Sequence, residues 1–193
     1  STTPMANFRH PKTEARQLLK KAADLRQQGR RHEAIAIYDE LIDSFGGFYN
    51  ERGVLYSECG EFGKAVVDFT DAISLDNTDS DLIINRGNAY LLSGALQAAI
   101  EDYTCAIQLS PKKACAFNGR GQAFAELGVF ERAMADFLSS IEIDREYVSP
   151  LFNLGVLLLR NQQLDLARDY LNRAAHLCPE DVAILGVRGD VNR

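Results

Sequence analysis

Residues 83–111 read IINRGNAYLLSGALQAAIEDYTCAIQLSP. From Ile83 onward, apolar residues recur at the spacing of one helix face. Gly94 follows, and a glycine after such a run favours the left-handed conformation that ends a helix. A second run, 96–109, has apolar residues at i, i+3, i+4 and i+7 and stops before Pro111. The stretch therefore predicts two helices joined by a tight turn.

The same pattern recurs along the chain with a period of 34 residues. Four columns of residues keep this period: glycines, then alanines 12 residues later, large residues 16 later and small residues 19 later. The columns are Gly53, Gly87, Gly121 and Gly155; Ala65, Ala99, Ala133 and Ala167; Phe69, Tyr103, Phe137 and Leu171; and Ala72, Ala106, Ser140 and Ala174. The same offsets occur once upstream, as Ala22, Ala34, Tyr38 and Leu41. The chain therefore holds five copies of one helix pair.

The column glycines lie inside the first helix of each copy, where glycine costs about 1 kcal/mol relative to alanine. We expect this cost to be offset by close approach of two helices, with the alanine column as the partner. A further column, Arg52, Arg86 and Arg120, precedes three of these glycines. It resembles a phosphate-binding stripe, but we favour a structural role in which the stems pack between helices and the heads reach polar groups.

Composition excludes several classes of protein. The 193 residues are 46% hydrophobic and 25% charged, as in ordinary globular chains, and no run approaches the roughly 18 apolar residues of a membrane span. A net charge of -6 gives no long-range attraction for nucleic acid or anionic lipid. Residues 1–12 lack the apolar core of a secretory signal, so the protein is cytoplasmic unless a signal was removed.

The repeated residues resemble the tetratricopeptide repeat, whose pattern is W-x2-L-G-x2-Y…A-x3-F…A…P. The third copy carries this pattern in Arg86, Gly87, Tyr90, Ala99, Tyr103, Ala106 and Pro111. Arginine replaces the usual leucine before three glycines, Ala22 stands for glycine in the first copy, and tryptophan is absent. The resemblance implies an all-α, right-handed solenoid of five helix pairs with a C-terminal capping or partial sixth-repeat helix.

The repeat register sets the expected boundaries. A tail at 1–14 precedes five repeats and a terminal helix in one continuous domain, at 15–45, 46–79, 80–113, 114–147, 148–181 and 182–193. The terminal helix lacks a second helix. It is either a solvating cap or the start of a truncated or self-associating unit, and its apolar residues, such as Ile184 and Leu185, favour the latter.

The resemblance also implies that the first helices line a concave groove. Six amide side chains fall on the expected groove face: Asn50, Asn85, Asn88, Asn118, Gln122 and Asn153. Amides both donate and accept hydrogen bonds, so a row of them can pair with the backbone of an extended peptide. The alternative is that asparagine is simply tolerated on a solvated helix face. We expect the groove positions to be exposed, with Lys20, Glu51 and Arg160 at the rim.

Catalytic and metal chemistry find little support. The histidines, His10, His32 and His176, lie far apart in the repeat frame, and no nucleotide, hydrolase or zinc-protease motif occurs. Consecutive acids such as Glu101 and Asp102, or Glu180 and Asp181, are interpreted as solvated charges or helix caps. The cysteines, Cys59, Cys105, Cys115 and Cys178, lack zinc or disulfide spacing and are interpreted as buried or half-buried thiols. We expect no metal and no cofactor.

The sequence therefore predicts a non-catalytic interaction module or adaptor that binds an extended or helical segment of another protein. A clamp for acidic chaperone tails is excluded, because the required basic residues are missing from the groove positions. Two alternatives remain: a self-assembling scaffold that pairs through the terminal helix and outer surface as a homo-oligomer, and the regulatory arm of a longer protein.

Overall fold

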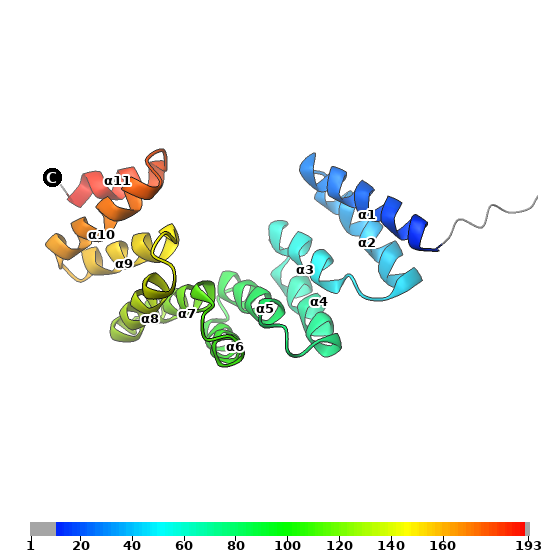
Figure 1. The fold of residues 1–193 in the computed structure, drawn as a ribbon, viewed down its shortest axis with the longest axis horizontal. Helices are drawn as coiled ribbons and strands as arrows, with labels where there is room; N and C mark the ends of the chain where they lie inside the picture. The colour runs from blue at the N-terminus through cyan, green and yellow to red at the C-terminus, as the bar shows by residue number, and fades with distance from the viewer. Residues whose placement is uncertain (1–10, 192–193) are drawn as a thin grey trace, which may run out of the picture. The chain divides into compact units, whose positions relative to one another are not determined.

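The computed structural model describes residues 11–191, and over that range the chain forms eleven α-helices and no strand (Figure 1). The helices follow one another as α1 Pro11–Gln27, α2 Arg31–Phe45, α3 Tyr49–Glu58, α4 Phe62–Leu75, α5 Ser80–Leu92, α6 Leu96–Leu109, α7 Ala114–Glu126, α8 Phe130–Ile143, α9 Val148–Arg160, α10 Leu164–Leu177 and α11 Val182–Val191. The prediction of an all-α helical-repeat solenoid is confirmed. The first helix begins at Pro11, so residues 11–14 belong to a helix rather than to the expected tail.

The described residues group into two compact units, which divide between residues 77 and 78. Unit 1 contains α1 to α4 and has a core in which Leu41 and Leu55 are buried. Unit 2 contains α5 to α11 and has a core that includes Phe137 and Leu151. Helical repeats bury apolar surface mainly against their sequence neighbours, so no single core needs to extend through the whole array.

The predicted helix ends are confirmed. Gly29, Gly60, Gly94 and Gly128 have φ values of 75°, 78°, 81° and 75°, which is the left-handed region that glycine enters without steric cost. Gln162 takes the same place in the fifth repeat with φ of 60°. Each helix pair is therefore closed by the same backbone turn.

Close approach at the column glycines is confirmed, but the main partner differs from the one expected. A Cβ atom at Gly53 would lie 2.8 Å from the Phe69 ring, and one at Gly155 would lie 2.7 Å from Leu171 Cγ. The large residue of the second helix therefore lies nearest to the glycine. The alanine is a further neighbour through its backbone oxygen, 3.3 Å away for Ala133 at Gly121 and 3.5 Å away for Ala167 at Gly155. Because protein interiors are close-packed, a large side chain fills the hollow left by each missing side chain.

The arginine column has the predicted structural role, in ion pairs with a column of aspartates. Arg86 Nε donates to Asp102 Oδ2 at 2.8 Å and its Nη2 donates to Oδ1 at 2.8 Å. Arg120 holds Asp136 through the same two atoms at 2.8 and 2.9 Å. The third pair, between Arg52 and Asp68, has distances of 2.8 and 2.7 Å.

These pairs lie at the interface between the two helices of a repeat, so their carboxylates are buried. The buried Asp102 corrects the interpretation of Glu101 and Asp102 as solvated charges or caps. Hydrogen bonds to Asp68 and Asp102 raise the pKa of Arg52 and of Arg86 above the usual arginine value. The guanidinium groups of Arg52 and Arg86 therefore stay charged.

Two further observations concern the surface. Among the described residues, no helix combines the length and the apolar character needed to cross a membrane. Cys59 is half-buried, which agrees with the expectation of buried or half-buried thiols, but Cys105, Cys115 and Cys178 are exposed, which corrects that expectation for these three. None of the four belongs to a repeat column, and the column residues fill the space between the helices.

Candidate functional site

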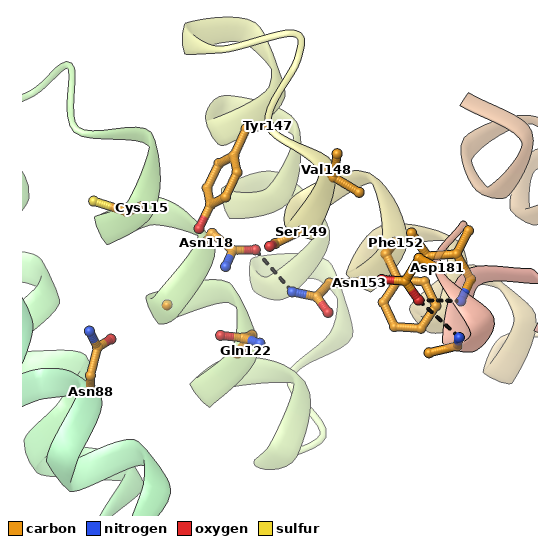
Figure 2. A pocket seen from close by; sticks show the side chains of 13 residues that line it. Asn88, Cys115, Asn118, Gln122, Tyr147, Val148, Ser149, Phe152, Asn153 and Asp181 are labelled. Atoms are coloured by element: carbon orange, nitrogen blue, oxygen red, sulfur yellow. Dashed lines mark hydrogen bonds between the residues drawn. The ribbon is translucent and has the colours of Figure 1, made fainter. Parts of the chain in front are cut away.

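A pocket of about 400 Å³ opens in unit 2, between α5, α7, α9 and the start of α11 (Figure 2). Four of the predicted amides line it: Asn88, Asn118, Gln122 and Asn153. The other lining residues are Cys115, Gly119, Tyr147, Val148, Ser149, Phe152, Asp181, Ala183 and Ile184. Since α5, α7 and α9 are the first helices of successive repeats, similar repeat positions meet on one surface.

Asn118 is the central amide. The sequence predicts that it is exposed, but the structure shows that it is buried. Its residue is only 6% exposed, and Asn153 Nδ2 donates to Asn118 Oδ1 at 3.0 Å (Figure 2). Burial raises the pKa of Tyr147, while hydrogen bonds of its side chain with Ser149 and Asn118 act in the opposite direction. Asn118 is therefore buried between α7 and the start of α9, where it orients Asn153 and Tyr147.

Tyr103 contacts two residues that line the pocket, Asn88 and Gly119, and Gly119 is a site residue that sequence reasoning missed. The Tyr103 hydroxyl donates to Asn88 Oδ1 at 2.7 Å, and the side chain is fully buried. A Cβ atom at Gly119 would lie 2.5 Å from Tyr103 Cζ, so only glycine fits there. The signal was present in the sequence, because Tyr103 is the largest member of its column and Gly119 is the only glycine at its repeat position.

Hydrogen-bonding capacity remains on several of these amides. Gln122 is half-buried, and its side chain makes no hydrogen bond to another described residue. Asn88 uses its oxygen for Tyr103, and Asn153 uses its nitrogen for Asn118. The Asn88 nitrogen and the Asn153 oxygen make no hydrogen bond within the described part of the chain. Together the three amides present both donors and acceptors to the pocket.

The pocket carries little charge. Asp181 is its one carboxylate, and Asp181 Oδ1 accepts hydrogen bonds from the backbone N–H groups of Ala183 at 2.9 Å and Ile184 at 3.1 Å. These bonds confirm the interpretation of Asp181 as a helix cap. Phe152 and Val148 add an apolar wall. The site can therefore accept a neutral polar group next to an apolar one.

The other predicted site residues lie elsewhere. Asn85 is on α5 in unit 2 but is not among the residues that line this pocket. Arg160 lines an adjoining pocket of about 180 Å³ together with Gln122 and Asn153. Asn50, Lys20 and Glu51 belong to unit 1. The structure thus brings four of the six amides around one pocket, and the amide row across all repeats stays a prediction.

Family models of the tetratricopeptide repeat match the chain in four places. The matched residues are 18–47, 47–79, 87–128 and 145–182, described as tetratricopeptide repeat or TPR repeat. Together these segments cover more than half of the sequence. The chain belongs to the tetratricopeptide repeat (TPR) family.

Solved structures share this fold at low sequence identity. The thermophilic TPR protein TTC0263 of Thermus thermophilus has a TM-score of 0.76 and 16% identity, over 92% of this chain and 98% of its own. MamA has a TM-score of 0.70 and 21% identity, over 81% of this chain and 93% of its own. YrrB, described as a TPR protein with an unusual peptide-binding site, has 0.66 and 19%, over 89% and 90%. No curated protein sequence matches the chain.

Proposed function

We propose that this protein is a non-catalytic adaptor that holds an extended segment of a partner protein in the pocket of unit 2. The observation that carries this proposal is the grouping of four amide side chains from three successive repeats around one pocket. A volume of about 400 Å³ suffices for a short stretch of peptide. That YrrB, with the same fold, is described as having a peptide-binding site supports this use of the fold.

The chemistry of the pocket favours a peptide backbone over a charged ligand. Gln122, Asn88 and Asn153 supply donors and acceptors that match peptide N–H and C=O groups. Phe152 and Val148 give an apolar side chain a surface to cover. Asp181 is the one charged side chain of the pocket lining and its Oδ1 caps α11, so the pocket holds no cluster of charges that would select an ionic partner. We therefore expect the pocket to bind peptides in which an apolar residue is flanked by uncharged residues.

The test is a screen of a random peptide library, followed by measurement of Kd for a selected peptide by fluorescence anisotropy. Gln122→Arg and Ser149→Arg place a large cation in the pocket, and each should weaken binding at least about tenfold by occupying the space of the peptide. Glu142→Arg is the matched control, since Glu142 is exposed on α8 and does not line the pocket. Binding of all three variants with the same Kd would contradict the proposal.

Salt provides a second readout. Because the pocket is nearly neutral, raising the ionic strength from low to physiological should change Kd by less than about twofold, whereas a charge-driven complex would weaken strongly. A steep loss of affinity with salt would show that the peptide binds another, charged surface.

A further inference from the structure

Three side chains able to bind a transition metal meet in unit 1, where the turn between α3 and α4 passes the start of α2. His32 lies in the first turn of α2, Cys59 directly follows α3, and Glu61 directly precedes α4. One ligand atom from each, a ring nitrogen, the Sγ atom and a carboxylate oxygen, lies within 4.8 Å of the other two. His32 Nε2 lies 3.2 Å from Glu61 Oε1.

The repeat fold does not require this group of residues. The positions one, two and three periods after Cys59 hold Ser93, Leu127 and Asn161. Those after Glu61 hold Ala95, Val129 and Gln163. Glu61 also makes no capping hydrogen bond to α4, although it stands at the N-cap. The three residues are therefore specific to this junction. Cys59 also packs against the core of unit 1, whereas helix capping does not account for Glu61.

We propose that His32, Cys59 and Glu61 bind one zinc ion. A set of one nitrogen, one sulfur and one oxygen ligand suits zinc, whereas magnesium and calcium take oxygen ligands. Two ligand atoms about 2 Å from a tetrahedral ion lie about 3.3 Å apart, which agrees with the separation between His32 and Glu61. This site is independent of the peptide pocket, which lies in the other unit.

The surroundings of His32, Cys59 and Glu61 allow their three ligand atoms to reach one metal ion. Cys59 is half-buried and held by the turn at Gly60, while the His32 side chain is 78% exposed and can rotate toward it. Lys64 forms an ion pair with Glu61 Oε2, so Oε1 faces His32. Coordination releases the Cys59 thiol proton to solvent and leaves a thiolate on the metal. The fourth position stays open for water, as in zinc sites with three protein ligands.

The sequence alone predicted no metal site here. His32 and Cys59 come from different repeats and lie far apart in the chain, so no short spacing motif links them. The helix packing of unit 1 places them together. Besides Glu61, the charged groups that interact electrostatically with the Cys59 thiol are Arg31 and Glu58, which form a hydrogen bond with each other.

The experiment uses cobalt(II) as a spectroscopic probe and zinc as a competitor, on the full chain. Cobalt should bind with a stoichiometry of one and give the charge-transfer absorption of a thiolate ligand, and zinc should abolish it. Cys59→Ser should lose this absorption. His32→Ala and Glu61→Gln should each weaken zinc binding at least about tenfold, as even outer-shell changes do at metal sites.

The matched controls are Cys105→Ser and His176→Ala, which remove an exposed cysteine and another histidine from unit 2. Both should bind cobalt and zinc like the parent. Zinc should also raise the melting temperature of unit 1 in the parent and in Cys105→Ser, but not in Cys59→Ser. Cobalt binding without thiolate absorption, or the same spectrum in Cys59→Ser and Cys105→Ser, would overturn the proposal.

Discussion

Two glycines of α7, Gly119 and Gly121, leave space in which large side chains of the neighbouring helices pack. A Cβ atom at Gly121 would lie 2.8 Å from the Phe137 ring, so Gly121→Ala should lower the free energy of unfolding by about 1 to 3 kcal/mol through overpacking. Gly119→Ala should act similarly against Tyr103. Urea denaturation measures both.

A glycine in open surroundings provides the control for these two substitutions. Gly63, in the first turn of α4, has nothing within 4 Å of the place its Cβ would take. Gly63→Ala should therefore stabilise the protein by up to about 1 kcal/mol, because alanine is the better helix former. A loss of stability at Gly63 equal to that at Gly121 would mean that crowding is not the cause.

Asn118 should behave as a structural residue. Asn118→Ala removes the acceptor of the half-buried Asn153 side chain and one of the two side-chain hydrogen bonds of Tyr147, and we expect a loss of about 1 to 2 kcal/mol in unfolding free energy. Gln122→Ala, in the same helix, should cost little, since Gln122 bonds to no other described side chain. Equal melting temperatures for the two variants would show that the bond to Asn153 contributes nothing.

Within each helix pair that carries them, the arginine and the aspartate contribute to stability as a coupled ion pair. Asp136→Ala leaves the guanidinium of Arg120 partly buried without its partner, and should cost about 3 kcal/mol. The fifth repeat carries Leu154 and Tyr170 at the equivalent positions, so the double variant Arg120→Leu, Asp136→Tyr should recover most of that loss. Thermal and urea unfolding of both variants provide the measurement, and a double variant as unstable as Asp136→Ala would contradict this account.

Helix existence and helix ends were predictable because both follow from local patterns. The periodic apolar residues and the glycines at 29, 60, 94 and 128 carry that information directly. The aspartate column was equally periodic, yet a buried carboxylate is recognised only when its partner helix is placed. The burial of Asn118 depends on how α9 covers α7, and the meeting of His32 with Cys59 depends on packing between repeats. These features are tertiary, and no local pattern encodes them.

At the scale of the whole molecule, each unit has its own core, and we expect local changes to remain local. Gly121→Ala should reduce protection from hydrogen exchange in α7 and its neighbours α6 and α8, while the protected amides of α1 to α4 keep their exchange rates. In repeat proteins stability is approximately a sum over neighbouring units, so a perturbation need not spread through the array. Native-state hydrogen exchange read by mass spectrometry measures this, and equal loss of protection in both units would contradict it.

The arrangement of the arginine–aspartate pairs has a consequence for how such genes change length. The pairs of Arg52 with Asp68, Arg86 with Asp102 and Arg120 with Asp136 each join the two helices of one repeat, so unequal recombination that duplicates or deletes the third or fourth repeat leaves no partner of such a pair behind. Arg52 also pairs with Asp39 of the first repeat, and that pair crosses a junction. Tyr103, by contrast, reaches into the following repeat and needs Gly119 there. A tandem duplication of the third repeat would set the copy of Asn85 against Tyr103. Length variation should therefore be least tolerated at the two junctions that these side chains cross, between the first and second repeats and between the third and fourth.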